Sequence, residues 1–383
     1  MWLYSILILI PLLGYLLFNE KLGHSVAFLA FYLFILALFV GLGDMLGGYD
    51  RYVYGEVFDD LADDLNLGRN PLSSTPFEIY PKEIGFDFYN LFIAFFTSNR
   101  YIFIFVTTLI IYLLLFSSFK KYLTNYPLGL FFFMSLWFFF TFTYLRQVLA
   151  ASIGFLCMNY IVERKPYKFL LVVLIAASFH NSALILIPFY FLPLKKHSPK
   201  NIIIVMLLCL IIGATGLPSS LFKVYDMTTQ TIRFAKYNQY GDSFRIAYVL
   251  EVIFFLYVVL SNYRLFDKNN KKDLVNLNMM LCFCATILLF VKSDNGGRIS
   301  WYFILGVIMT ISKVVQKTSQ RKFYLCLVIP LFLVLYFRVY NAWQVTKNLY
   351  PYKTFLTNGH RPGDVVWQDC EYDGNYDRDK FYR

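Results

Sequence analysis

Long apolar runs alternate with short polar segments along almost the whole chain. About 20 apolar residues at roughly 1.5 Å each cross the hydrocarbon core of a bilayer. Because lipid offers no hydrogen bonds, the backbone of each run must satisfy itself, which favours helices. Clear runs cover residues 1–18, 25–43, 101–119, 201–217, 246–263, 274–292, 298–315 and 323–341. Together with two longer blocks, they predict an all-α, polytopic integral membrane protein with about 10–12 transmembrane helices.

The two longer blocks each contain a polar interruption. Residues 128–162 would extend about 52 Å as one helix, enough to cross twice, so we predict a hairpin that turns near Thr143–Arg146. Residues 168–194 would extend about 40 Å, which predicts a short, broken hairpin that turns at His180. That turn would lie below the outer surface, where irregular backbone survives only against protein or a water-filled cavity.

Composition and charge support a membrane protein and orient it. Of the 383 residues, 58% are hydrophobic and only 15% are charged, against about 25% charged in soluble domains. The net charge of +11 is concentrated in short loops such as 120–121, 163–168 and 195–200. This is the positive-inside pattern and not a nucleic-acid-binding surface. We therefore predict that these loops are cytoplasmic and that nucleic acid is not a partner.

The remaining loops are then external. They are residues 44–100, 218–245, the turn at 292–298 and a tail, 342–383, that follows a membrane domain of residues 1–341. The loop 44–100 includes an amphipathic segment and holds ten Asp and Glu residues against four Lys and Arg. This arrangement predicts that the polar candidates described below share one external face.

The chain lacks several familiar signals. The N-terminal run has no basic region and no small-residue cleavage site, so we interpret it as a retained first helix. Five of the six cysteines lie inside apolar runs, and none has metal-ligand or disulfide spacing. Four aspartates are grouped at positions 59, 60, 63 and 64; we interpret them as a solvated patch and not as a Mg²⁺ site. We therefore predict no metal and no cofactor.

Two arginines interrupt or border apolar runs. A guanidinium is never neutral in a protein and is costly in hydrocarbon. Arg146 is followed by Gln147 and then by a stripe of small residues that permits close helix packing. Arg146 either binds an anion at the mouth of a cavity or reaches the interface to end a helix. Arg298 follows a Gly-Gly turn and has the same two interpretations, with Tyr302 one turn later.

His180 is one of four histidines in the chain. An imidazole can exchange a proton near neutral pH and can hydrogen-bond an oxyanion. Asn181 and Ser182 after it are good helix-start residues, so the alternative is an ordinary capped turn. Its place in the broken hairpin favours function.

The external loop opens with Asp50, Arg51 and Tyr54, which directly follow two glycines. An aromatic ring packs on the C–H face of a sugar, while neighbouring charged groups bind its hydroxyls. The sequence therefore suggests a sugar-binding segment, with plain solvated surface as the alternative.

Three segments together resemble the EpsG-like branch of the Wzy-type bacterial polysaccharide polymerases. They are GYDRYVYGEVF with KEIGFDFYNLFIAFF in the first external loop, LRQVLAASI, and RKPYKFLLVVLIAASFHNSALILIPFYF. The similarity covers roughly residues 25–340. It implies a fold like the GT-C glycosyltransferases and a bacterial inner-membrane enzyme active at the external face.

The resemblance implies joining of oligosaccharide repeats carried on undecaprenyl diphosphate, with membrane lipid and a chain-length regulator protein as candidate partners. From residues and resemblance together, the predicted catalytic residues are His180, Asp50 and Arg146, and the predicted substrate-binding residues are Arg51, Tyr54, Gln147, Ser182, Arg298 and Tyr302. A transporter or flippase of the same lipid-linked sugar, and a transferase that modifies a finished repeat, stay open as alternatives.

Overall fold

The computed structural model describes residues 2–43, 49–221, 224, 243–293, 296–345, 349, 352 and 354–356, and these residues are helical throughout their regular structure. The first half contains α1 (Trp2–Leu22), α2 (Val26–Gly41), α3 (Tyr49–Asn66), η2 (Pro71–Ser73), α4 (Thr75–Ile79), α5 (Ile84–Ala94), α6 (Arg100–Tyr122), α7 (Tyr126–Leu136), η3 (Phe138–Phe142), α8 (Leu145–Phe155), α9 (Met158–Val162) and α10 (Pro166–Phe179). The second half contains η4 (Asn181–Ile185), α11 (Leu186–Phe191), α12 (Pro199–Ala214), α14 (Ile246–Ser261), η6 (Tyr263–Leu265), α15 (Lys271–Leu289), η7 (Gly296–Phe303), α16 (Ile304–Lys317) and α17 (Arg321–Val345).

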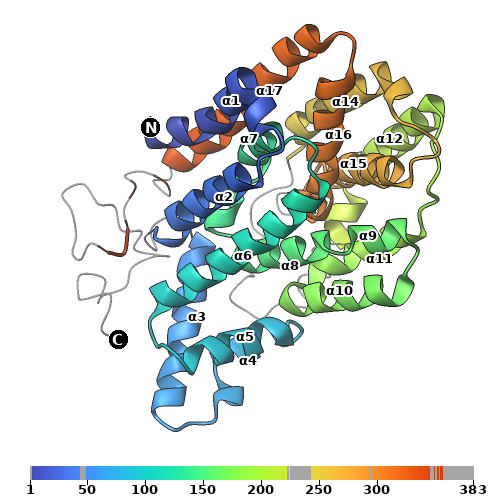
Figure 1. Ribbon diagram of the computed structural model, residues 1–383. Helices are drawn as coiled ribbons and strands as arrows, with labels where there is room; N and C mark the ends of the chain where they lie inside the picture. The colour runs from blue at the N-terminus through green and yellow to red at the C-terminus, as the bar shows by residue number, and fades with distance from the viewer. Residues whose placement is uncertain are drawn as a thin grey trace.

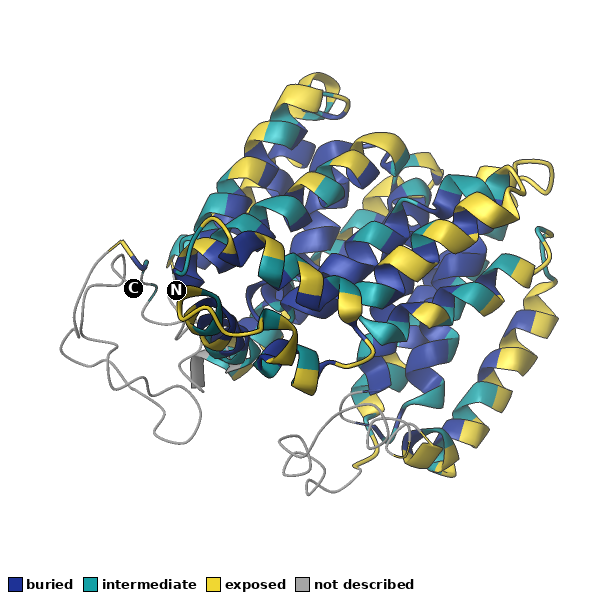
Figure 2. Ribbon diagram, turned by 90° about the horizontal axis from the view of Figure 1, so that it is seen from below, coloured by how far each residue is buried: buried dark blue, intermediate teal, exposed yellow. Residues whose placement is uncertain are grey.

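The helices confirm the predicted all-α, polytopic class. Within the described part of the chain, six helical segments are long and apolar enough to cross a membrane, and a further set of apolar helices is shorter. Their outer faces carry exposed large hydrophobic side chains, while the centre of the bundle is buried (Figure 2). Apolar surface of this extent is what a bilayer covers, so the chain is an integral membrane protein. The likeness to GT-C enzymes and the count of 10–12 crossings stay predictions.

Both long blocks are broken where polar residues interrupt them. The first is divided into α7, η3, α8 and α9, and the break before α8 falls at Thr143 and Tyr144. In the second, η4 and α11 pack back against α10, with His180 as the joint between the two arms. The predicted short hairpin is therefore present, and it places the His180 side chain at its turn.

The two ends of the described chain pack together. Helices α1 and α17 lie side by side (Figure 1), and the Tyr336 hydroxyl donates to the Tyr4 carbonyl at 2.8 Å. Beyond α17, the Tyr352 hydroxyl donates to the Phe39 carbonyl at 2.8 Å, and the Phe355 ring stacks on Tyr101. The predicted tail thus returns to the helix bundle at these residues, and α17 itself extends to Val345.

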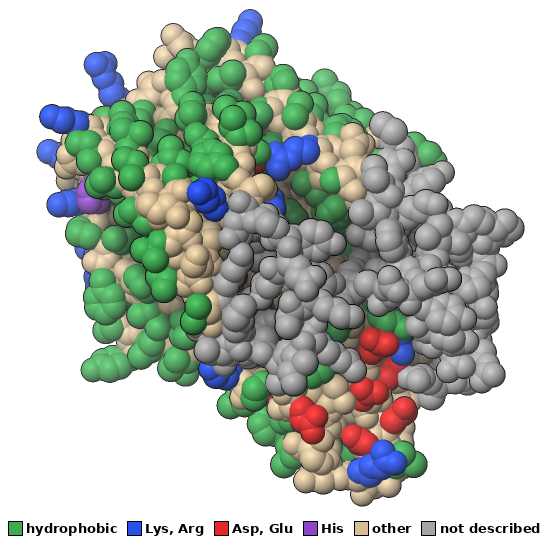
Figure 3. Space-filling view, turned by 180° about the vertical axis from the view of Figure 1, so that it is seen from behind, with side chains coloured by type: hydrophobic (Ala, Val, Ile, Leu, Met, Phe, Trp, Pro, Cys, Tyr) green, Lys and Arg blue, Asp and Glu red, His purple; other side chains and the backbone are tan. Residues whose placement is uncertain are grey.

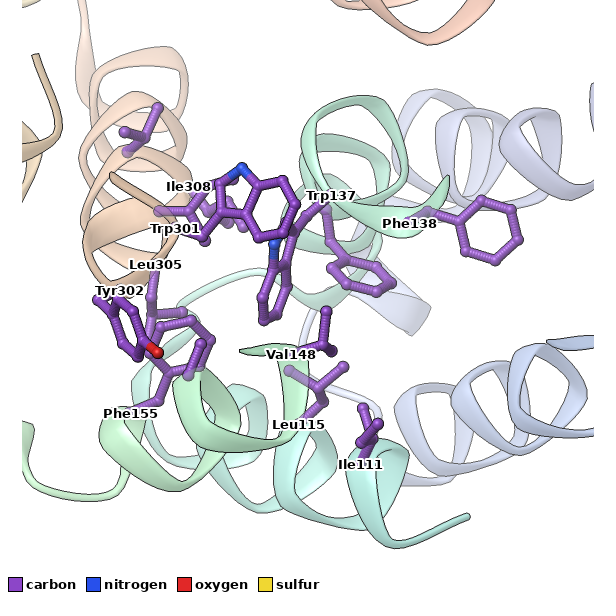
Figure 4. Packing of buried hydrophobic residues seen from close by; sticks show 14 of the residues in the cluster. Ile111, Leu115, Trp137, Phe138, Val148, Phe155, Trp301, Tyr302, Leu305 and Ile308 are labelled. Atoms are coloured by element: carbon purple, nitrogen blue, oxygen red, sulfur yellow. The ribbon is translucent and has the colours of Figure 1, made fainter. Parts of the chain in front are cut away.

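The core lies where α6, η3, α8 and η7 meet. Trp137 packs against Phe155 and Trp301, with ring centroids 5.5 and 6.5 Å apart (Figure 4). Tyr302 lies at the side of this cluster next to Phe155 (Figure 4) and is fully buried. The core therefore holds η7, with Arg298 and Tyr302, in a fixed position relative to α8.

Acidic side chains gather at the end of the molecule formed by α3 and α4 (Figures 1 and 3). Most Lys and Arg side chains seen on the face in Figure 3 lie toward the opposite end. This distribution agrees with an acidic external loop and basic cytoplasmic loops.

Two glycines inside helices provide a test of the packing. A Cβ on Gly306 would lie 2.5 Å from the Met279 Cβ and 2.7 Å from the Met280 nitrogen, whereas a Cβ on Gly14 would meet nothing closer than 3.5 Å. We expect Gly306→Ala to destabilise the α15–α16 contact by about 1–3 kcal/mol because it overpacks the interface. The matched control Gly14→Ala should leave the thermal midpoint of the detergent-solubilised protein unchanged or higher. Equal midpoints for the two variants would contradict this packing.

Candidate functional site

The polar residues of the site lie at the ends of helices. Asp50 is the second residue of α3, Arg146 is the second residue of α8, and His180 directly precedes η4. Glu83 directly precedes α5, and Arg298 lies in the first turn of η7. Helix ends carry unpaired backbone groups, so the segments that meet here bring polar backbone and polar side chains to one place.

The centre of the site is a buried ion pair. The Arg146 guanidinium donates to a carboxylate oxygen of Glu83, and the whole residues are only 5% and 8% exposed. The Arg146 Cζ also lies 3.7 Å from the centroid of the Tyr80 ring and 5.3 Å from that of Tyr54. Cation–π contacts of this kind stabilise a guanidinium most when it is desolvated. Arg146 is thus held by a carboxylate and by aromatic faces.

Glu83 also connects Arg146 to the hairpin turn. Its other carboxylate oxygen accepts a hydrogen bond from the Asn181 backbone N–H at 3.0 Å and lies 3.9 Å from His180 Nδ1. Burial would raise the pKa of Glu83, but the charge of Arg146, with His180 and the Asn181 N–H, holds it below its ordinary value. Glu83 is therefore ionised, and it fixes the start of η4.

A chain of hydroxyls extends from His180 to the core. His180 Nδ1 is 2.8 Å from the Ser182 hydroxyl, which is 3.0 Å from the Tyr302 hydroxyl. The direction of each hydrogen bond depends on the tautomer of the imidazole. Nδ1 is engaged in this chain, whereas Nε2 lies outside it. The chain also fixes the orientation of the ring.

Arg298 contacts the residues at the start of α8. Its Cζ lies 4.2 Å from the centroid of the Tyr144 ring, and its carbonyl accepts a hydrogen bond from Gln147 Nε2 at 3.0 Å. Burial raises the pKa of Asp50, and the charges of Arg298 and Arg146 partly oppose this rise. Asp50 is therefore close enough to interact electrostatically with both guanidiniums.

Of the predicted site residues, Arg51 lies apart. It is 1% exposed, and its guanidinium donates to the carbonyls of Val40, Gly41 and Gly43 at 2.9, 3.2 and 2.7 Å. These carbonyls belong to the C-terminal end of α2, where a cation is favourable. In this structure Arg51 stabilises a helix end, and its role as a sugar ligand stays a prediction.

Sequence reasoning missed Glu83, Tyr80 and Tyr144. Glu83 lies in the segment KEIGFDFYNLFIAFF, which carries part of the family resemblance, and it directly precedes an apolar amphipathic stretch. These features could have pointed to Glu83. However, the loop contains ten acidic residues, and the sequence does not distinguish Glu83 from the others. The interpretation of the four grouped aspartates as a solvated patch is wrong for Asp59, which is buried and pairs with Arg100. No cluster of metal-ligating side chains occurs among residues the structure describes.

The fold and site define a polytopic helical membrane protein with a buried polar cluster inside an apolar bundle. The chain belongs to the EpsG family, which matches residues 3–354 and is tied to exopolysaccharide biosynthesis. No curated protein and no solved structure shows a detectable match to it. The family assignment covers every segment that contributes to the site.

Because Arg146 and Glu83 form a buried ion pair, we predict that the effects of their substitutions on stability are strongly non-additive. Removing one partner of a buried ion pair costs about 3–5 kcal/mol because the other charge is left unpaired. We expect Glu83→Gln and Arg146→Gln each to lower the free energy of unfolding by this amount, and the double variant to lower it by much less than the sum. Unfolding of the purified variants in detergent measures this cycle; additive effects would show that the two charges do not interact.

Asp87 provides a pH-dependent test. It is fully buried one turn after Glu83, and neither carboxylate oxygen has a hydrogen-bond partner within the described structure. Burial, together with the negative charge of Glu83, raises the pKa of Asp87 to about 8. The folded protein therefore binds a proton that the unfolded chain releases.

Stability should consequently fall as the pH rises from about 5 to about 8. We expect the thermal midpoint of the wild type to fall relative to that of Asp87→Asn over this interval, since the amide stays neutral. The two proteins are compared in the same detergent and buffers. Midpoint curves that run parallel would mean that Asp87 is ionised in the folded protein.

Proposed function

We propose that this chain is a polymerase of lipid-linked oligosaccharide repeats at the external face of the bacterial inner membrane. The observation that carries the proposal is the convergence of His180, Asp50 and Arg298 at one buried polar cluster, in a chain of the EpsG family. Ionisable groups inside a membrane bundle are costly and usually functional. The predicted topology places their segments on the external side, where lipid-linked repeats are polymerised.

The reaction is a glycosyl transfer. A hydroxyl oxygen of one lipid-linked repeat forms a bond to the anomeric carbon of the growing glycan, and the bond from that carbon to the diphosphate oxygen breaks. The hydroxyl proton passes to a base, for which His180 Nε2 and the Asp50 carboxylate are the candidates. Undecaprenyl diphosphate leaves with the bonding electron pair.

Arg298 is the cation best placed to stabilise the leaving diphosphate. Its side chain is half-buried over the Tyr144 ring, and it lines a cavity beside the site. A fixed guanidinium in a water-poor site stabilises developing negative charge by a few kcal/mol. Arg146 has a different role in this mechanism, because its guanidinium holds Glu83 and through it the His180 turn. Direct contact of Arg146 with phosphate stays a prediction.

The experiment uses the lipid-linked repeat that accumulates in a host strain lacking the chain. We expect vesicles containing the purified protein to convert this lipid into a ladder of longer glycans with release of undecaprenyl diphosphate. His180→Ala should reduce the rate by about 10²–10⁴-fold, the usual contribution of a positioned acid or base. His24→Ala is the matched control, since His24 is exposed in the turn between α1 and α2.

Two outcomes would contradict the polymerase, and a third would remove only His180 from its mechanism. Movement of the lipid across the vesicle membrane without lengthening would indicate a transporter. Addition of one group to each repeat would indicate a modifying transferase. A ladder at the wild-type rate from folded His180→Ala would remove the imidazole from the mechanism and leave Asp50 as the base.

A further inference from the structure

A cavity of about 420 Å³ lies beside Tyr144 and Arg298, and neither Arg146 nor Glu83 is among its described lining residues. Its walls come from η7, the first turns of α14, the last turns of α17 and the segment around η3. Pockets that bind small molecules are commonly about 300–1,000 Å³, and this cavity falls in that range. Its volume suits a lipid headgroup and not a whole glycan chain. None of the predicted site residues except Arg298 lines it.

Three guanidiniums come together in the described part of the lining. The described lining residues include the guanidiniums of Arg245, Arg298 and Arg338 and the single carboxylate of Glu251. Guanidiniums bind phosphate oxygens through paired hydrogen bonds, and three of them in one wall can contact more than one phosphate group. A diphosphate diester, which carries two negative charges, matches this lining.

Aromatic rings form another part of the wall. Phe140 and Trp301 stack with centroids 4.5 Å apart, and Tyr144 and Trp343 lie within 6.5 Å of each other. Flat aromatic faces pack on the C–H face of a sugar ring. The cavity thus combines a binding surface for phosphate with one for the first sugar attached to it.

The cavity is placed at the edge of the bundle, near lipid. Ile246, Leu250 and Ile253 of α14 are exposed on the outer surface, as is Val334 of α17. The Arg338 side chain is 52% exposed on that same helix α17. Arg245 begins α14, and Arg338 lies in the last turns of α17, which are both ends that we predict at the external interface. A phosphate on a bilayer-anchored lipid lies at this depth.

We infer that this cavity binds the diphosphate and first sugar of a polyprenyl-linked donor, with Arg245 and Arg338 as phosphate ligands beside Arg298. The inference rests on the proposed function and adds the donor's position to it. The lipid tail leaves between α14 and α17 into the bilayer, and the anomeric carbon lies toward Tyr144 and the polar cluster. Phospholipid phosphate has related chemistry, so the experiment separates the two.

Glu251 provides a variant that should strengthen diphosphate binding, whereas the arginine variants should weaken it. Its carboxylate lies 3.7 Å from the Arg338 guanidinium, and α14 and α17 are joined there. A bound diphosphate competes with Glu251 for Arg338 and is repelled by its charge. Removing that charge therefore favours the anion, whereas removing an ordinary structural ion pair would only weaken the fold.

The experiment measures binding of undecaprenyl diphosphate, phosphatidylglycerol and inorganic pyrophosphate to the purified full-length protein in detergent, by native mass spectrometry with titration. We expect Arg245→Gln and Arg338→Gln each to weaken binding of undecaprenyl diphosphate at least tenfold. Glu251→Gln should tighten it severalfold. Arg321→Gln is the matched control, because Arg321 begins the same helix α17 at its other end and does not line the cavity. Thermal midpoints verify that each variant is folded.

Unchanged binding in folded Arg245→Gln and Arg338→Gln, or weaker binding in Glu251→Gln, would overturn the inference. Equal loss for phosphatidylglycerol would assign the cavity to ordinary phospholipid. Polymer formation is then measured on the same variants. A wild-type ladder from Arg245→Gln/Arg338→Gln would reject the donor cavity but leave the proposed polymerase standing. Diphosphate binding as expected, without any ladder from the wild type, would reject the polymerase but leave the cavity as a lipid-diphosphate site.

Discussion

The ion pair between Arg146 and Glu83 is the interaction on which the arrangement of this site depends. It lies in the interior of a bundle with a large apolar core, so an unpaired charge there would be costly. Glu83 comes from the loop before α5, Arg146 from the break before α8, and the Asn181 N–H from the hairpin turn. One carboxylate therefore fixes three chain segments whose positions along the sequence are far apart.

The need to surround this ion pair with polar groups explains why the helices are broken near it. An uninterrupted helix through residues 137–144 or through His180 would form all of its backbone hydrogen bonds internally. It would then have no helix end, and no unpaired backbone group, at the site. The breaks free backbone groups and give short segments that can turn polar side chains inward. The hydrogen bonds from Asn181 to Glu83 and from Gln147 to Arg298 use side chains and backbone at these breaks. The cost of each break is offset by partners that lie across the cluster.

Sequence reasoning predicted the class of fold, and it also singled out several residues that the structure brings near Glu83, for a definite physical reason. In a chain this apolar, each polar interruption of a membrane run must be accounted for, so Arg146, His180 and Arg298 were visible as exceptions. Glu83 was not visible because a single acidic residue in an acidic loop breaks no pattern; only its burial against Arg146 distinguishes it. Arg51 was predicted as a sugar ligand from its neighbours, but the direction in which α3 begins turns it toward the carbonyls of α2. Local sequence contains no information on that direction.

The arginines of the bundle differ in how their charge is satisfied, and this difference separates structural from functional roles. Arg51 is buried against backbone carbonyls, and Arg100 and Arg146 are buried against carboxylates. These charges already have strong partners, so a ligand would have to break a buried interaction to reach them. Arg298 and Arg338 are more exposed and line a cavity. The ion pair of Arg338 with Glu251, at 3.7 Å and with a half-exposed guanidinium, is weaker than a short buried ion pair. An anion can compete for such a contact at a lower cost than for a buried one. The same residue type thus builds the scaffold where its partners are buried, and at Arg338 it keeps an accessible guanidinium in the wall of a cavity.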